Sequence, residues 1–255
     1  MCLALFALDA HPRFALVVAA NRDEYHTRPA VPAAWRDEGW LAGRDLEAGG
    51  TWFAVTRSAR WAFVTNVRDP SRFDPHAPSR GALVPAVLDD TAAPTEGIGR
   101  IVAAARACNG FNLVAGAGID ACWGSNRAGA TRTLAPGIYG LSNAALDTPW
   151  PKVERTKAAL GAWCARGDAD TASLFAILAD RSGAPDDQLP ATGIPLDRER
   201  LLAPPFIVSE TYGTRCSTVL TLSRDRDARF TERTFDPSGR LTGEVDERFT
   251  VLPAR

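Results

Sequence analysis

The stretch that decides the fold is residues 3–24, LALFALDAHPRFALVVAANRDE. Two apolar runs, residues 3–8 and 14–20, stand on either side of the polar segment DAHPR. Short apolar runs separated by such a segment predict a strand, a turn and a strand. We therefore expect a β-hairpin, with residue 2 starting the edge of a sheet and residues 21–24 following directly after the second strand.

The polar cluster Asn21-Arg22-Asp23-Glu24 gives this hairpin a candidate chemistry. Because an antiparallel hairpin returns the end of its second strand to the start of its first, Arg22 and Asp23 should lie close to Cys2. A guanidinium lowers the pKa of a nearby thiol, and a carboxylate can orient an ammonium group. Consecutive polar residues more commonly solvate a loop, and a single cysteine is more commonly a small core residue. Both interpretations stay open on these residues alone.

Cys2 can act as a nucleophile without a histidine. Residue 2 is small, which is the condition under which Met1 is normally removed, and Cys2 would then carry a thiol and a free α-amine. An α-amine with a pKa of about 8 can take the proton of the adjacent thiol at neutral pH. None of the three histidines lies near a serine or cysteine in a recognisable catalytic signature. We predict that Cys2 is an N-terminal nucleophile.

Length and composition restrict the function further. A chain of 255 residues with 45% hydrophobic content can bury one core, so we expect a single domain over residues 1–255. Its 29 basic and 30 acidic residues are well mixed, which argues against nucleic acid as a partner. The five cysteines form no Cys-x-x-Cys pair, and we expect no metal site. No basic segment precedes the first apolar run, and charges interrupt it, so we expect no signal peptide, no stable membrane insertion and a cytoplasmic location.

The order of predicted elements indicates the fold class. Helical spacing of apolar residues predicts helices at residues 81–88, 94–106, 150–165 and 169–178. Further strands are predicted at residues 51–56, 60–67, 111–115, 119–123, 206–208, 216–222, 230–235 and 245–250, with residues 183–205 as a long surface loop. Grouped strands and grouped helices favour an α+β fold with stacked layers over an alternating parallel-sheet fold.

With Cys2 and residues 21–24, the sequence resembles the NRDE family, the transport and Golgi organisation protein 2 homologues. Other segments resemble family segments in the same order. They are Gly49-Gly50-Thr51-Trp52, Thr65-Asn66-Val67, Ser79-Arg80-Gly81, Asn109-Gly110-Phe111-Asn112-Leu113, Gly140-Leu141-Ser142-Asn143 and Tyr212-Gly213-Thr214-Arg215. Each segment is a weak signal, but the ordered set, which spans residues 1 to about 220, is specific.

The resemblance implies a four-layer αββα sandwich of the N-terminal-nucleophile hydrolase type, with two stacked, mainly antiparallel sheets flanked by helices. In the wider relatives, the choloylglycine and penicillin V amidohydrolases, an N-terminal cysteine works with an arginine, an aspartate and asparagines. By position, the resemblance implies a catalytic set of Cys2, Arg22, Asp23, Asn66, Asn143 and Arg215. Ligand contacts are expected from Asn21, Glu24 and Trp52.

This chain departs from those hydrolases in having Arg22 and Asp23 adjacent instead of separated by two residues. Neighbours on a strand face opposite sides, so only one of the two is expected to face Cys2.

Three functions are compatible with the sequence. The first is a hydrolase acting on a non-peptide amide or acyl compound, with Cys2 as nucleophile after Met1 removal and with no cofactor. The second is a non-catalytic carrier or chaperone of haem or a lipid-related small molecule on the same fold, because family members have been linked to haem movement and lipid metabolism. The chain has no Cys-x-x-Cys-His haem motif. The third is a retired enzyme fold that serves as an interaction module and tolerates a retained Met1. The oligomeric state is left open.

Overall fold

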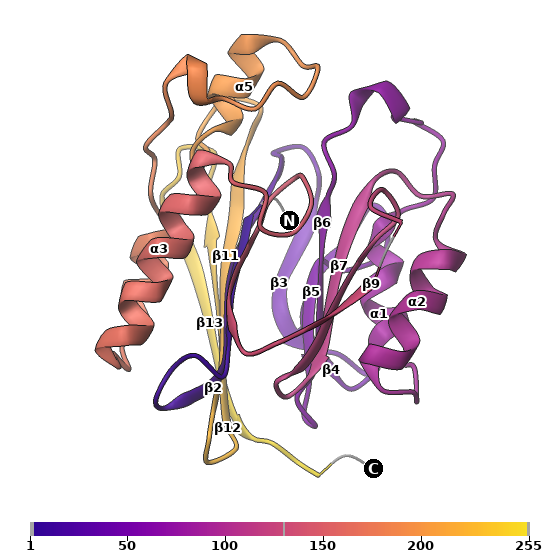
Figure 1. Cartoon of the computed structure of the whole chain (residues 1–255), viewed down its shortest axis with the longest axis vertical. Coiled ribbons are helices and arrows are strands. Elements are labelled where there is room, and N and C mark those ends of the chain that lie inside the picture. Colours follow the sequence, from indigo (N-terminus) through magenta and orange to yellow (C-terminus); the bar gives the residue numbers. More distant parts are fainter. Residues whose placement is uncertain (1–2, 130, 254–255) are drawn as a thin grey trace.

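The computed structural model describes residues 3–129 and 131–253. Two antiparallel sheets are stacked face to face, and helices cover the outer face of each (Figure 1). The first sheet has the strand order β10 (Gly137–Leu141), β1 (Leu3–Leu8), β2 (Phe14–Tyr25), β11 (Tyr212–Ser223), β12 (Asp227–Phe235) and β13 (Leu241–Thr250). The second has the order β3 (Ala30–Trp35), β4 (Trp40–Asp45), β5 (Phe53–Thr56), β6 (Arg60–Asn66), β7 (Phe111–Ala117), β8 (Asp120–Ser125) and β9 (Thr131–Leu134).

Alternation along the strands builds three hydrophobic layers. In β1, Phe6 faces the second sheet and packs on Phe63 at 5.7 Å between ring centroids, whereas Leu5 faces the helices outside the first sheet. Helices α3 (Pro151–Arg166) and α4 (Ala172–Leu178) cover that outer face, and α1 (Leu83–Leu88) and α2 (Pro94–Ala104) cover the second sheet. The predicted α+β class and αββα layering are confirmed.

Several predicted elements differ from the structure. Strand β2 does not end before the polar cluster but continues to Tyr25, because β11 pairs with it as far as Tyr212. Strand β1 is not at an edge, since β10 flanks it on the other side. Residues 206–208 form no strand, and the loop predicted at 183–205 contains helix α5 (Leu196–Leu202). Strands β3, β4, β9 and β10 were not predicted.

No helix among the described residues is both long and apolar enough to cross a membrane.

Candidate functional site

A cleft with two adjoining lobes opens at the end of the sandwich where β2, β6 and β11 bring their polar residues. The polar lobe, about 350 Å³, is lined by residues that include Arg22, Asp23, Glu24, Arg28, Asp45 and Trp52. The apolar lobe, about 380 Å³, is lined by residues that include Asn143, Lys152, Ile194, Leu202, Ile207 and Tyr212. Asn66, Phe73, Arg80 and Asn109 line both lobes. The cleft is large enough for a small molecule.

Arg22 crosses from the first sheet to the second. Its Nη2 donates to Asp45 Oδ2 at 3.0 Å, and its guanidinium lies over the Trp52 ring at 4.5 Å from the centroid. The residue is 4% exposed, and Nη1 has no hydrogen-bond partner in the described part of the chain. Arg22 therefore lines the polar lobe and keeps one buried donor without a partner among the described residues.

Asp45 holds this arginine in place and is nearly buried itself. Its Oδ2 also accepts from Arg28 Nε at 2.6 Å, and its Oδ1 accepts from the backbone N–H groups of Glu47 and Ala48. Burial alone would raise the pKa of Asp45, but these hydrogen bonds and the charges of Arg28 and Arg22 bring the pKa below its ordinary value. Asp45 is thus an anion that fixes two arginines in the polar lobe.

Asp23 follows Arg22 on the strand, yet it bonds within its own sheet. Thr214 Oγ1 donates to Asp23 Oδ1 at 2.6 Å and accepts from the backbone N–H of Ile207 at 2.9 Å. The pairing of β2 with β11 is irregular between Thr214 and Cys216, where one extra residue is inserted. The two adjacent residues therefore reach different elements, as strand alternation predicts, although both line the polar lobe.

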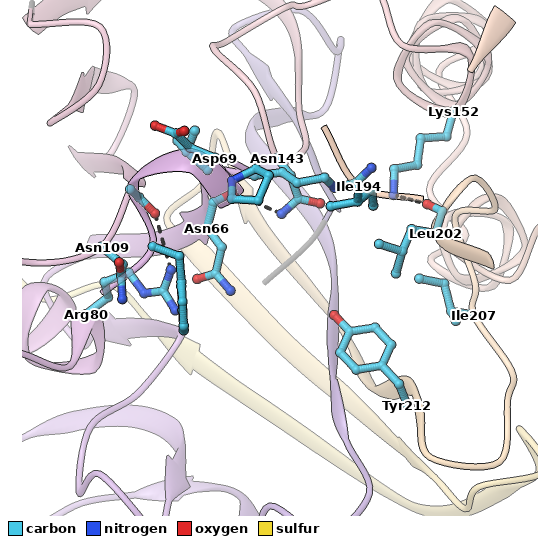
Figure 2. A pocket seen from close by; sticks show the side chains of 15 residues that line it. Asn66, Asp69, Arg80, Asn109, Asn143, Lys152, Ile194, Leu202, Ile207 and Tyr212 are labelled. Carbon is cyan, nitrogen blue, oxygen red and sulfur yellow. Dashed lines mark hydrogen bonds between the residues drawn. The ribbon is translucent and has the colours of Figure 1, made fainter. Parts of the chain in front are cut away.

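Asn66 and Asn143 meet at the junction of the lobes. Asn143 Nδ2 donates to the backbone oxygen of Asn66 at 2.9 Å, so the side chain of one residue fixes the backbone of the other. The Asn66 amide itself makes no hydrogen bond within residues 3–129 and 131–253. Figure 2 shows Asn66, Asn143 and Tyr212 around a common space, with Lys152 on its far side. The Asn66 amide is available to a ligand.

The other predicted site residues have different positions. Asn21 is fully buried: its Nδ2 donates to Leu178 O and Pro205 O, both at 2.9 Å, and its Oδ1 accepts from Ser217 Oγ. Arg215 donates to the backbone oxygens of residues 25, 26 and 28. Neither Asn21 nor Arg215 lines a lobe, and the contacts predicted for them stay predictions.

Glu24 and Trp52 do line the polar lobe. Cys2 lies outside the described residues.

A profile of the Transport and Golgi organisation 2 family matches residues 1–237. The chain belongs to this family.

Relatives in this Transport and Golgi organisation 2 family match along most of their length. The Bos taurus homologue is 35% identical over 256 residues, covering 91% of this chain and 92% of the relative. The Homo sapiens homologue is 31% identical with the same coverage. A solved structure, a Caenorhabditis elegans orthologue of N-acylethanolamine-hydrolyzing acid amidase, aligns with 86% of this chain and 92% of its own, at 10% identity and a TM-score of 0.49.

Two of the family segments, those containing Gly50 and Gly81, approach each other so closely that a residue larger than glycine at position 50 would clash. A Cβ at Gly50 would lie 2.4 Å from the carbonyl carbon of Gly81, and Thr51 N donates to Gly81 O at 3.1 Å. The Gly-Gly pair therefore lets the loop after β4 pack against residues 79–81, which end at the rim of the polar lobe. In this member of the family the pair serves contact between two loops.

Sequence reasoning missed Asp45, Arg28, Phe73 and Asn109 as parts of the site. A carboxylate shortly after the apolar residues Trp40-Leu41-Ala42, followed by Gly49-Gly50, was the available signal for Asp45. Among the described residues, no three His, Cys, Asp or Glu side chains cluster in a way that could hold a metal ion.

Proposed function

We propose that this protein is an N-terminal-nucleophile hydrolase that acts on a small non-peptide amide or acyl compound, with Cys2 as nucleophile after removal of Met1. One observation carries the proposal. Leu3, the first described residue, pairs with Asn21, and the next residue, Arg22, lines a cleft that also contains the available amide of Asn66. A guanidinium and an available amide in a cleft next to the described start of β1 are groups that this chemistry uses.

The reaction needs only groups of this chain and water. The Cys2 thiol gives its proton to the α-amine, and the sulfur attacks the carbonyl carbon, so that the carbonyl π pair moves to oxygen. When the C–N bond breaks, the ammonium returns the proton to the leaving amine. Water then attacks the thioester, which releases the acid and restores the thiol. Both half-reactions pass through an oxyanion.

Asn66 is the better donor to that oxyanion. Its amide group is unused within the described chain and faces both lobes, whereas Asn143 Nδ2 already donates to Asn66 O. Asn143 then acts as a positioning residue for Asn66. A donor aimed at a developing oxyanion contributes about 10²–10³-fold to turnover. We expect Asn66→Ala to reduce turnover by this factor and Asn143→Ala to act through the position of Asn66.

The remaining cysteines are unsuited to nucleophilic attack. Cys108, Cys122, Cys164 and Cys216 are all buried. Burial raises the pKa of Cys122 to about 12 and that of Cys164 to about 11, and it also raises those of Cys108 and Cys216. Since the thiolate is the nucleophile, these four thiols should be inert at neutral pH.

The test is selective labelling of Cys2 with a thiol-directed acylating probe, on protein whose intact mass shows that Met1 is absent. We expect one adduct, on Cys2, and none in Cys2→Ala, while Cys108→Ala labels like the natural chain. Turnover of a panel of small amides should be lost in Cys2→Ala. Labelling that spares Cys2 in a chain lacking Met1, or turnover that survives in Cys2→Ala, contradicts the proposal.

A carrier function is the second candidate, and the apolar lobe favours it. A lobe of about 380 Å³ with Ile194, Leu202 and Ile207 on its wall can hold an apolar molecule without chemistry. None of His11, His26 and His76 lines either lobe, so a carried haem would have no histidine ligand from the described cleft. Tight binding of haem or of a lipid-related small molecule, with no product formed and with the same affinity in Cys2→Ala, would favour the carrier function. The cytoplasmic location stays a prediction.

A further inference from the structure

We infer that Phe73 is a specificity-determining residue that packs against an apolar portion of the ligand at the junction of the two lobes. The inference deepens the proposed function and rests on it for the identity of the cleft. Phe73 lines both lobes and is 65% exposed. It belongs to none of the three hydrophobic clusters of the fold.

Hydrogen bonds hold the backbone on both sides of Phe73 in place, so the fold itself keeps the Phe73 side chain exposed. The side chain of Asn109 makes two hydrogen bonds with the backbone of Asp74, the residue after Phe73. Asn109 Oδ1 accepts from Asp74 N at 2.9 Å, and Asn109 Nδ2 donates to Asp74 O at 2.7 Å. On the other side, Asp69 Oδ2 accepts from Arg127 Nε at 3.1 Å, and Asp69 Oδ1 accepts from Ser71 Oγ. These contacts tie residues 69–74 to the turn before β7 and the loop after β8.

An aromatic side chain held in water by a fixed loop has no role in the stability of the core. Exposed large apolar groups are common singly, but this one borders a cavity on two sides. Aromatic side chains contribute much apolar area with little loss of conformational freedom, which suits them to ligand contact. Packing a molecule against Phe73 would remove that area from water.

The surroundings of Phe73 define the ligand class. On one side lie the apolar walls formed by Leu202 and Ile207, and on the other lie Arg22 and Asp45. A molecule that spans the junction must therefore be amphipathic, with its apolar portion against Phe73 and its polar portion in the polar lobe. A uniformly polar compound would leave the Phe73 ring in water and gain nothing from it.

The first measurement is fluorescence titration with 1-anilinonaphthalene-8-sulfonate, a small amphipathic aromatic anion. We expect Phe73→Ala to weaken binding about tenfold, because burial of a phenyl group contributes on that order. The affinity of Phe73→Leu should lie between those of the natural chain and Phe73→Ala. The matched control is Ile119→Ala, an exposed apolar residue in the β7–β8 turn, at the opposite end of the sheet from Asn66. It should bind as the natural chain does.

The second measurement compares two alkylating reagents at Cys2, iodoacetamide and its N-phenyl derivative, in protein without Met1. We expect the phenyl reagent to be preferred, and Phe73→Ala to abolish the preference while keeping the iodoacetamide rate. If Cys2 reacts with neither reagent, the proposed nucleophile is wrong, and the titration still judges Phe73. Unchanged titration in Phe73→Ala, or an equal loss in Ile119→Ala, overturns the inference.

Discussion

Arg22 and Asp45 form an ion pair of 3.0 Å that joins the two sheets at the wall of the polar lobe. Arg22 comes from β2 and Asp45 from β4, and both are more than nine-tenths buried. A buried ion pair is not always a net gain in stability, but removing one partner leaves the other charge uncompensated. The pair therefore couples the geometry of the site to the packing of the sheets.

Replacing Asp45 by asparagine should destabilise the fold by about 3 kcal/mol, because the buried Arg22 guanidinium then loses the carboxylate with which it forms an ion pair. Urea unfolding measures the free energy. The matched control is Glu47→Gln, which removes an exposed carboxylate 3.1 Å from Arg28 and should change stability by less than about 1 kcal/mol. Equal stability of the two variants would contradict the role given to Asp45.

The same pair predicts a pH dependence. Because the folded pKa of Asp45 is lowered, its stabilising contribution is present above the unfolded pKa of about 3.9 and is lost as the pH falls through the folded value. We expect the stability difference between the natural chain and Asp45→Asn to shrink as the pH falls below about 4. A difference that stays constant from pH 7 to pH 3 would contradict the lowered pKa.

Glu232 should change the stability of the fold with pH in the direction opposite to Asp45. Its carboxylate lies between the sheets, where Oε1 accepts from Ala33 N at 2.7 Å and Oε2 accepts from Thr218 Oγ1 at 3.1 Å. Burial raises its pKa, although these hydrogen bonds, one with Cys216 and the charge of Arg22 act against the rise. The folded chain then holds the proton more tightly than the unfolded chain. Above the unfolded pKa of about 4.3, stability falls as the pH rises toward the folded value.

Glu232→Gln removes that titration, so its stability relative to the natural chain should improve between pH 4 and pH 8. Urea unfolding at several pH values measures the difference. Glu244→Gln serves as the control, since Glu244 pairs with Arg233 at 2.6 Å on the surface. A Glu232→Gln variant that loses stability equally at every pH would indicate a hydrogen-bonding role without titration.

The first hairpin could be predicted because its apolar runs at residues 3–8 and 14–20 are separated by the polar segment at residues 9–13. The end of β2 could not, since Asn21-Arg22-Asp23-Glu24 has the composition of a loop. Those residues are in a strand because β11, almost 200 positions later, supplies the ladder through Gly213↔Glu24 and Cys216↔Arg22. Such pairing is a tertiary effect that local patterns do not contain.

The candidate site could be predicted only in part, because tertiary contacts bring its residues together as well. Arg22, Asp23, Glu24 and Trp52 line the polar lobe, and Asn66 and Asn143 meet at the junction, whereas the roles that the resemblance implies for them stay predictions. Asp45 has only a weak local signature and Phe73 has none, because Asp45 is defined by its contact with Arg22 and Phe73 by its exposure beside a cavity. Helix α5 was hidden by the prolines around it, although Pro195 immediately precedes the helix, where proline is tolerated.

Asn21→Ala tests whether this residue serves the fold or the ligand. The substitution leaves Leu178 O and Pro205 O without their donor and Ser217 Oγ without its acceptor, all in buried surroundings. We expect a loss of roughly 3 kcal/mol in urea unfolding. Ser217→Ala, which removes one of these bonds, should cost less. An Asn21→Ala variant of natural stability but weakened ligand binding would instead restore the predicted ligand contact.

Gly50→Ala tests whether the approach of two backbones positions the rim of the cleft. The added Cβ would lie 2.4 Å from the Gly81 carbonyl carbon, and because both groups are backbone, one loop must move. We expect a loss of about 1–3 kcal/mol, together with weaker binding of 1-anilinonaphthalene-8-sulfonate, since residues 79–81 line the polar lobe. Gly183→Ala, where a Cβ meets nothing within 4 Å, is the matched control. Natural stability and binding in Gly50→Ala would show that the loops separate without consequence for the cleft.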